Sequence, residues 1–498
     1  MRPAKKQAQQ FRYQTAQLKH LLFLGFLVLF GVIGLLWFAR PKTSVLEKRE
    51  LTKFPEFSLA GVWDGSFFSQ VDTWYSDTYP LREGLIGADK KLESLYGIRT
   101  QQLVSSGQKA DEIPTGTVDL EALAGKSTEP EDSSEATEPA PDTTATPADT
   151  EQSTKPAETE KPTDPPETEA PTKPEGDGHG ANDVTTPAEL SGTIYITQNC
   201  GYGVYYFSQS GSAKYCLLVN KLAKAVAGKA QVYDLIGPIS AGIMLSDSAR
   251  ESTGGSDENE AMNWMFNNMD ASVKKVAVYN TLKAHNDEYI YFHTDHHWTA
   301  LGAYYAYREF CSQKGITPHA LSDFETYTFP GFLGTFYSSS NQSPALASNP
   351  DTVTAYIPKG TNSMTMYVSN GNGTYTEYPW RIVNDVSNYA KSELYATFAG
   401  GDQPYNYAHN ETITDGSAVL IVKDSYGNAF IPFLVDHYEH IYWIDYRSYK
   451  SWCAWAGVSD SSISNLVERK NIQDVILCNN INSTGSDSLL KTMEKIFK

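Results

Sequence analysis

The sequence lacks the paired cysteines of a structural zinc site and the basic patches of a nucleic-acid-binding protein. Its 498 residues include only five cysteines, and no two of them form a Cys-x-x-Cys pair. A structural zinc site made of cysteines is therefore not expected. The odd number argues against a framework in which every cysteine is paired; Cys200 and Cys216 could form one bridge, and the others have the character of small buried hydrophobes. No basic patch is present, which argues against a nucleic-acid-binding protein.

Large apolar side chains are scarce in one long segment, and most of the acidity lies there. The formal net charge is −19, and residues 111–178 hold 19 acidic side chains against four lysines, so the rest of the chain is near neutral. From 108 to 189 the composition is dominated by Thr, Glu, Pro, Asp, Ala and Ser. Such a segment cannot bury enough apolar surface to offset the entropy of ordering it. We expect 108–189 to be a disordered linker or stalk.

Charge is absent from a second segment, residues 21–38, which reads LLFLGFLVLFGVIGLLWF. At 1.5 Å per residue a helix of this length spans roughly 27 Å, enough to cross the hydrocarbon core of a bilayer. A cleaved signal peptide usually has a shorter apolar region and a small-x-small site, and the Ala-Arg-Pro-Lys that follows is a poor one. We therefore expect a retained signal anchor at 21–38 after a cytoplasmic tail at 1–20. The cations on its two sides balance, so they do not set the orientation.

Two further regions have globular character. Residues 45–104 contain apolar side chains at helical spacing and predict two helices separated by a turn at 79–82. From 190 to 498, apolar runs that read as strands alternate with helical patterns, which predicts an α/β domain with a mostly parallel sheet flanked by helices. Residues 321–410 differ, because short alternating runs and Asn-Gly turns there predict a β-rich insertion. The expected strands include GTIYIT, GVYYFS, AQVYDLIGP, EYIYFHT, SAVLIVKDS, HIYWIDYR and DVILCNN.

The first site with chemical potential is the sequence Lys-Asp-Ser-Tyr-Gly-Asn at 423–428. It follows a continuous apolar run that predicts a buried strand, and a helical pattern begins directly after it. A serine at such a turn, here Ser425, would expose its hydroxyl above the sheet edge. Backbone N–H groups of the new helix would then face a developing oxyanion, and Gly427 would allow substrate to approach the backbone. The alternative is an ordinary Asp-Ser helix cap.

The second site is the sequence Phe-His-Thr-Asp-His-His-Trp-Thr at 292–299. A serine nucleophile needs an imidazole base, and the imidazole needs a carboxylate to hold its tautomer. Asp295 and His297 could face each other in an irregular turn. Two alternatives remain at this point: a metal site made of Asp295 with the three histidines, His293, His296 and His297, or a capping and core role for these residues. Both sites are expected just past the C-terminal end of a strand, the edge where open α/β sheets bind ligands.

At these residues the sequence resembles the DHHW family of the SGNH-hydrolase superfamily, which is related to the alginate O-acetylation proteins of Gram-negative periplasms. The matching segments are ELTKFPEFS, DTYPLREGLI, TDHHWTALGAYYAY and KDSYGNAF. They fall within 45–104 and 190–498, and the linker lies outside the resemblance. The order, Asp-His before Ser, is the reverse of that in ordinary SGNH hydrolases.

The resemblance implies an SGNH-like fold in which Ser425 is the nucleophile, His297 the base and Asp295 its orienting acid, without a metal or cofactor. His296 is then the less favoured base. Weaker implications concern substrate or oxyanion contacts, for which the positions are Tyr426, Gly427, Arg447, Asn479 and Asn480. The resemblance also implies that 45–104 packs near the catalytic domain.

The function expected from the resemblance is O-acetyl transfer to a cell-envelope polysaccharide by an extracellular domain on a single-pass membrane anchor. Acetyl-CoA is absent outside the cell, so a membrane-bound O-acyltransferase partner would supply the acetyl group. Two other functions remain open. One is a carbohydrate acetylesterase with the same three residues, and the other is a non-catalytic envelope scaffold or carbohydrate-binding protein.

Overall fold

The computed structural model describes residues 40, 43–44, 49–50, 52–55, 57, 66–79, 110–116, 118–125, 189–191 and 193–498. The expected anchor at 21–38 and the second helix expected within 45–104 lie outside these residues. No helix in the described ranges has the length and apolar character needed to cross a membrane. The described residues fall into two units, one containing 40–79 and the other 110–498.

The smaller unit contains one described helix, α3 (Ser66–Asp77), and two short antiparallel strands, β1 (Thr43–Ser44) and β2 (Arg49–Glu50). The guanidinium of Arg40 lies 4.0 Å from the ring centroid of Trp74 on α3 and donates to the Thr78 hydroxyl. Phe54 packs edge-on against the same ring. The first helix expected in 45–104 is therefore present.

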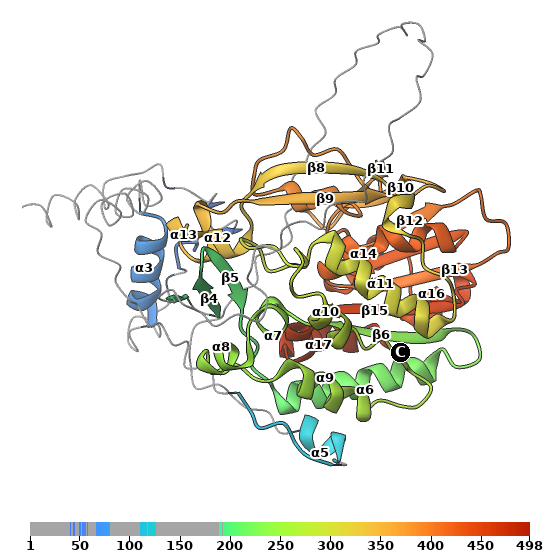
Figure 1. Cartoon of the computed structure of the whole chain (residues 1–498), viewed down its shortest axis with the longest axis horizontal. Helices are drawn as coiled ribbons and strands as arrows, with labels where there is room; N and C mark the ends of the chain where they lie inside the picture. The colour runs from blue at the N-terminus through green and yellow to red at the C-terminus, as the bar shows by residue number, and fades with distance from the viewer. Residues whose placement is uncertain are drawn as a thin grey trace, which may run out of the picture. The chain divides into compact units, whose positions relative to one another are not determined.

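The larger unit is built around one sheet of eight strands. These are β6 (Gln231–Gly237), β7 (Lys274–Lys275), β10 (Ser363–Ser369), β11 (Tyr375–Arg381), β12 (Asn406–His409), β13 (Ala418–Lys423), β14 (His440–Asp445) and β15 (Asp474–Asn480). Their order is β11-β10-β12-β14-β13-β15-β6-β7 (Figure 1). The five strands from β14 to β7 are parallel, and the other three continue the sheet in antiparallel fashion. The fold is thus mixed α/β, as the sequence predicts.

Helices cover both faces of the parallel strands. One set packs on α6 (Gln209–Ala225): α9 (Glu258–Asn267), α16 (Ile463–Lys470) and α17 (Asp487–Glu494), while α15 (Tyr446–Trp455) packs on α17. The other set is α10 (Tyr279–Ala284), α11 (Ala300–Lys314) and α14 (Tyr426–Leu434), of which α14 packs on β13 and β15. Every residue of β13 and β15 is buried, which explains their unbroken apolar runs. Two short helices, α7 (Ser240–Met244) and α8 (Asp247–Ser252), follow β6.

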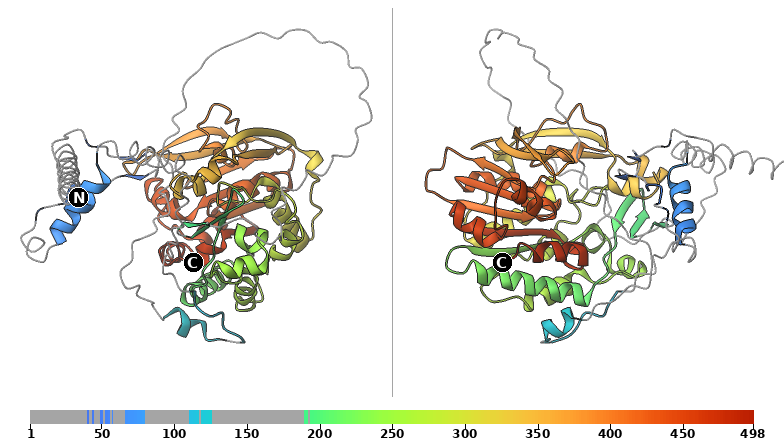
Figure 2. Two further views of the ribbon diagram at one scale, coloured as in Figure 1. Left: turned by 60° about the vertical axis from the view of Figure 1, so that its left-hand side comes forward. Right: turned by 180° about the vertical axis from the view of Figure 1, so that it is seen from behind.

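The β-rich region expected at 321–410 is present, but it is not a separate layer. Its strands β10, β11 and β12 extend the main sheet, whereas β8 (Glu325–Phe332) and β9 (Asp351–Ile357) form a two-stranded sheet of their own. Figure 2 shows these strands together at one end of the unit, beside the strands that follow them in the chain. Two short helices, α12 (Thr335–Ser339) and α13 (Pro344–Ala347), lie between β8 and β9 in the chain. The sheet pairing that joins the region to the core is a tertiary feature without a local sequence pattern.

Two of the expected strands are wrong. EYIYFHT (288–294) makes only an isolated bridge between Tyr291 and Trp298. Its backbone N–H groups at His293 and Thr294 donate to the Asp351 carboxylate instead of to a neighbouring strand. GVYYFS lies almost wholly after β5 (Cys200–Gly203), which pairs with β4 (Ile194–Thr197) and, through it, with β3 (Glu189–Ser191). Both segments are apolar because they are buried, and burial alone does not make a strand.

The segment expected to be a disordered linker at 108–189 begins with residues that have defined structure. Helix α5 (Leu120–Ala124) packs on α6, and Asp119 caps it by accepting two backbone N–H bonds. Asp111 joins the chain to the domain, because its N–H donates to Phe207 and its carboxylate accepts from the Gln209 N–H. Apolar side chains at Ile113, Leu120 and Leu123 pack against the core and give these residues a reason to order. Residues 126–188 lie outside the described part.

All five cysteines are buried and free. The bridge considered between Cys200 and Cys216 is therefore not formed. Burial raises the pKa of the Cys216 thiol, which keeps it protonated and unreactive.

Strand β6 carries a buried carboxylate that makes stability depend on pH. Asp234 is fully buried; its Oδ1 accepts a hydrogen bond of 2.6 Å from the Tyr215 hydroxyl, and its Oδ2 has no partner among the described residues. Burial raises the pKa of Asp234 from 3.8 to about 7, against smaller opposite effects of Tyr215 and Lys275. Because this pKa is higher in the folded state, the contribution of Asp234 to stability is complete below pH 3.8 and is lost as pH rises through about 7.

We expect Asp234→Asn to remove this pH dependence. Relative to the variant, the free energy of unfolding of the wild type should fall by up to about 1.4 kcal/mol per pH unit between about pH 4 and 7. Urea denaturation across this range measures the difference. Asp385→Asn, at an exposed aspartate, is the matched control and should keep the wild-type slope. If the free energy of unfolding of the wild type and of Asp234→Asn changed with pH in the same way, Asp234 would be ionised in the folded protein across this range.

Candidate active site

Ser425 stands between β13 and α14, at the C-terminal edge of the parallel strands. It is half-buried and precedes the first residue of the helix. Asp424 is buried beneath it, where the carboxylate accepts from the Tyr426 N–H at 2.9 Å and from the Ser483 hydroxyl at 2.7 Å. The serine thus lies at a strand-to-helix turn whose neighbours are held in place, as expected from the sequence.

The turn at 293–297 also reaches Ser425, although His297 precedes Ser425 by 128 residues in the sequence. Asp351, at the start of β9, holds one end of this turn: its carboxylate accepts from the His293 and Thr294 N–H groups and from the Thr294 hydroxyl. Thr294 in turn accepts from the Gly334 N–H through its hydroxyl and from the Tyr337 N–H through its carbonyl. The turn is therefore fixed by the region 321–410.

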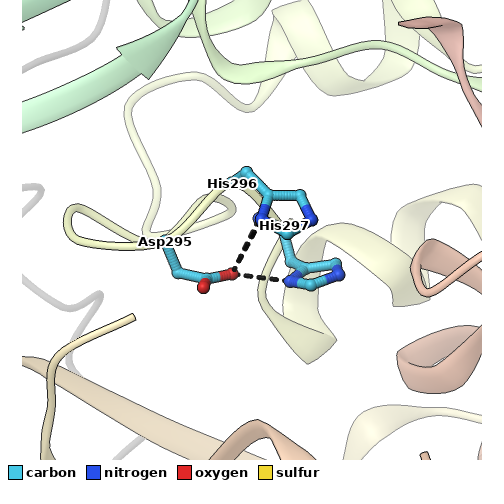
Figure 3. A group of neighbouring side chains, drawn as sticks. All are labelled: Asp295, His296 and His297. Carbon is cyan, nitrogen blue, oxygen red and sulfur yellow. Dashed lines mark hydrogen bonds and ion pairs between the residues drawn. The ribbon is translucent and has the colours of Figure 1, made fainter. Parts of the chain in front are cut away.

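The side chains of Asp295, His297 and Ser425 form a continuous chain of hydrogen bonds. His297 Nδ1 lies 2.6 Å from Asp295 Oδ1, and His297 Nε2 lies 2.7 Å from Ser425 Oγ. Figure 3 shows how the carboxylate faces the His297 ring, with the His296 ring beside it at a longer distance of 3.9 Å. This arrangement is that of a nucleophile, a base and an orienting acid. The side chains of Asp295 and His297 are 3% and 6% exposed, so these two residues are shielded from bulk water.

Two hydrogen bonds join the turn at 293–297, the histidine turn, and the adjacent Trp298 to α14, the helix that follows Ser425. The Trp298 indole donates to the Tyr426 carbonyl at 3.0 Å, and the Tyr426 hydroxyl donates to the His296 carbonyl at 2.7 Å. Tyr395 adds a third contact, because its ring stacks on the His297 imidazole at 3.9 Å and its hydroxyl donates to the Ser425 carbonyl. These contacts hold the imidazole in one plane facing Ser425.

The charge on Asp295 is favoured by its surroundings. Burial by itself would raise its pKa, but the charges of His297 and His296, with hydrogen bonds from His297 and the Thr335 N–H, lower the pKa of Asp295 below its usual value. Oδ2 accepts from both the Thr335 N–H and its hydroxyl. The acid therefore stays ionised over the whole neutral range.

A network of buried and half-buried charges supports the end of β13. The Lys423 ammonium is fully buried and lies 2.9 Å from Asp402 Oδ1 and 3.6 Å from Asp445 Oδ2. Arg447 donates to Asp445 through Nε at 2.9 Å and lies 2.8 Å from Asp402 Oδ2. Burial would raise the pKa of Asp402, but Lys423 and Arg447 lower it below its usual value. Since both oxygens of Asp402 and Asp445 pair with these cations, Arg447 is held in place by two carboxylates of the protein.

The amides expected near an oxyanion are also engaged elsewhere. Asn480 donates to the Asp424 carboxylate through its backbone and its side chain, and Asn479 is fully buried beside the Tyr215 hydroxyl. The N–H groups of Tyr426, Gly427 and Asn428 are bonded to Asp424 and Ser425. A Cβ atom at Gly427 would lie 2.6 Å from Lys423 Cβ, so this glycine serves helix packing. The Ser425 N–H has no hydrogen-bond partner among the described residues.

The arrangement does not favour the metal site considered from the sequence. Asp295, His296 and His297 do gather closely enough to hold an ion. However, both ring nitrogens of His297 are bonded to Asp295 and Ser425, and His296 Nδ1 lies 2.5 Å from the Thr335 hydroxyl. His293 Nδ1 is 3.1 Å from the Asn349 amide, at the other end of the turn.

The residues that support the site and were not predicted from the sequence include Gly334, Thr335 and Tyr395. All belong to the region 321–410, which carries neither a motif nor a periodic pattern at these positions. Gly334 packs so closely on Asp295 that a Cβ atom there would overlap the carboxylate. Their roles depend on contacts between parts of the chain that are distant in sequence.

The family model described as "DHHW protein" matches residues 47–444. The chain belongs to the DHHW family. The crystal structure of a DHHW family protein from Eubacterium siraeum is similar, with a TM-score of 0.53 and 26% identity over 63% of this chain and 99% of that one. No curated protein matches.

Two other solved structures are more distant from this DHHW protein. PatB1 of Bacillus cereus, solved with a sulfonyl adduct, has a TM-score of 0.49 and 17% identity over 60% of this chain and 97% of that one. The O-acetyltransferase domain of AlgJ from Pseudomonas putida has a TM-score of 0.30 and 12% identity over 61% and 96%. Similarity at this level is too low to transfer chemistry.

The close packing of Gly334 on Asp295 predicts that the site is sensitive to one added methyl group. We expect Gly334→Ala to displace the carboxylate and to lower the rate at which a fluorophosphonate labels Ser425 by about 100-fold, the cost of a displacement near 1 Å. Gly125→Ala is the control, because its Cβ would meet only ordinary contacts, the nearest at 3.4 Å. Wild-type labelling of a folded Gly334→Ala protein would contradict the importance of this packing.

Proposed function

We propose that this DHHW protein is a serine O-acetyltransferase that modifies hydroxyl groups of a cell-envelope polysaccharide through an acetyl-serine at Ser425. The observation that carries the proposal is the hydrogen-bonded chain Asp295–His297–Ser425, with distances of 2.6 and 2.7 Å. The half-buried serine leaves its hydroxyl within reach of a substrate, whereas the base and acid are shielded. Such a chain serves acyl transfer on several unrelated folds.

The proposed reaction has two symmetrical halves. Ser425 Oγ attacks the carbonyl carbon of an acetyl donor while His297 Nε2 takes the hydroxyl proton. The bond between that carbon and the donor oxygen then breaks, and the leaving oxygen receives the proton. In the second half, His297 takes a proton from a sugar hydroxyl, whose oxygen attacks the acetyl carbon, and Ser425 Oγ leaves with the proton. Asp295 stabilises the imidazolium in both halves, and the Ser425 N–H stabilises the oxyanion.

The acceptor and the location rest on the resemblance to the alginate O-acetylation proteins and on the apolar segment at 21–38. Both support a domain outside the membrane on a single-pass anchor. No acetyl-CoA is present there, so the donor is proposed to be a membrane-bound O-acyltransferase. The region 45–104 is proposed to pack near the catalytic domain.

The proposed roles predict different effects for two adjacent histidines. We expect Ser425→Ala and His297→Gln each to lower the hydrolysis of an aryl acetate at least about 1000-fold, since each removes a member of the catalytic chain. His296→Gln is the matched control and should lose much less, because His296 Nδ1 bonds the Thr335 hydroxyl whereas His297 is the histidine bonded to Ser425. A Ser425→Ala protein with the wild-type rate would refute the proposal.

Transfer and hydrolysis differ only in the acceptor, and their products separate them. With an aryl acetate as donor, we expect added oligosaccharide to become acetylated, and the ratio of acetyl-sugar to acetate to rise with oligosaccharide concentration. Mass spectrometry of the sugar measures this ratio. Release of acetate alone, together with deacetylation of an acetylated oligosaccharide, would identify an esterase. Folded protein whose Ser425 does not react with a fluorophosphonate would indicate a non-catalytic scaffold.

A further inference from the structure

A second group of three possible metal ligands lies away from the candidate active site. In the part of the chain that the structure describes, the donor atoms of His409, Glu439 and His440 come within 4.8 Å of one another. His409 ends β12 and His440 begins β14, whose N-terminal end is opposite to the edge that carries Ser425. About five strand residues, roughly 17 Å, separate the two edges. The group is therefore independent of the proposed acyl transfer.

The strand register brings the two histidines together. His409 and His440 are directly opposite in the antiparallel pair of β12 and β14, so their side chains leave the same face of the sheet. Their rings are stacked with centroids 4.9 Å apart and planes 22° apart. Such a pair is stiffer than two histidines on a mobile loop, because both backbones belong to the sheet.

Glu439 directs one carboxylate oxygen at both rings. Its Oε1 lies 3.7 Å from His409 Nε2 and 3.6 Å from His440 Nε2. The other oxygen, Oε2, accepts a 2.7 Å hydrogen bond from the Gly416 N–H, and the Glu439 backbone N–H donates to the Ser417 hydroxyl. These bonds fix the carboxylate and leave Oε1 for a ligand.

The distances suit a transition metal. Bonds of about 2.0–2.1 Å in a tetrahedral site place neighbouring donor atoms about 3.3–3.4 Å apart. The two separations between Glu439 Oε1 and the histidine nitrogens are a few tenths of an ångström longer, and all three donor atoms lie within 4.8 Å of one another. Two imidazoles and one carboxylate are the ligands of zinc rather than of calcium or magnesium, which prefer oxygen. The side chains of His409, Glu439 and His440 are 42%, 18% and 30% exposed, which leaves room for a water as the fourth ligand.

The second nitrogen of His440 has a hydrogen-bond partner, as the second nitrogen of a metal-binding imidazole almost always does. His440 Nδ1 lies 3.0 Å from the Tyr407 hydroxyl, and Tyr407 is two residues before His409 on the same face of β12. Such a partner fixes the tautomer and directs Nε2 to the metal. The Tyr407 ring is itself held by stacking on Tyr442 at 4.8 Å.

We propose that His409, Glu439 and His440 form a binding site for a divalent transition metal ion, with zinc as the expected metal. The bound ion would link β12 to β14. Strand β12 is the one through which the region 321–410 joins the parallel sheet. An ion at this position bridges the two strands in the folded protein only, so it stabilises their pairing.

The test uses the full chain, freed of metal with EDTA and titrated with zinc chloride at pH 7.5. Calorimetry should show one saturable equivalent, and zinc should raise Tm by a few degrees. Replacing any of the three ligands, by His409→Asn, Glu439→Gln or His440→Asn, should weaken binding at least tenfold and abolish the rise. Tyr407→Phe should weaken binding by roughly tenfold while the ligands remain. Calcium and magnesium at the same concentration should have no effect.

Two control variants separate this site from other histidines. His285→Asn removes a histidine that pairs with Glu288 and belongs to neither group of three possible ligands among the described residues, and it should bind zinc as the wild type does. His296→Asn removes a member of the group at the candidate active site. Binding that survives His296→Asn and is lost in His409→Asn supports the proposal. Absence of saturable binding, or binding that His409→Asn leaves intact, overturns it without bearing on acyl transfer.

Discussion

The site depends on one constraint: the turn at 293–297 must meet the first turn of α14 although 128 residues separate them. Hydrogen bonds from the Trp298 indole to the Tyr426 carbonyl and from the Tyr426 hydroxyl to the His296 carbonyl enforce this meeting, and the Trp298 and Tyr426 side chains are fully buried. A buried donor or acceptor that loses its partner costs about 1–3 kcal/mol. Moving either segment away from the other would leave such a group unpaired. These hydrogen bonds bring His297 Nε2 to 2.7 Å from Ser425 Oγ.

The rest of the larger unit positions the two segments that meet, the start of α14 with Ser425 and the turn at 293–297. On one side, the parallel strands deliver Ser425 to the sheet edge, and the paired charges of Lys423, Asp402 and Arg447 keep the end of β13 in place. On the other side, Asp351 and Thr335 hold the histidine turn through its backbone and through Asp295. A buried charge is tolerated only with partners, and each of these charges has them. The region 321–410 therefore has a part in the site as well as in the sheet.

Much of the fold was predictable because its signals are local. The unbroken apolar runs of β13 and β15 indicate strands covered on both faces, and helical spacing indicates α6, α9, α11 and α14. The same logic failed for 288–294, since an apolar run that is buried in an irregular turn looks like a strand. It also missed the defined structure at 110–116 and 118–125, where a few apolar side chains in an acidic stretch pack against the core and α5 packs on α6.

By itself the sequence determined which side chains have the chemistry of a nucleophile, a base and an acid, and it placed Ser425 at a strand-to-helix turn. Tertiary structure alone decided that these three meet, that Asn479, Asn480 and Arg447 are engaged inside the protein, and that Gly334, Thr335 and Tyr395 support the site. It also brought His409 and His440 face to face across two strands. The physical reason is range: periodicity and capping act between neighbours in the chain, whereas hydrogen bonds and packing join residues whose separation in sequence leaves no pattern.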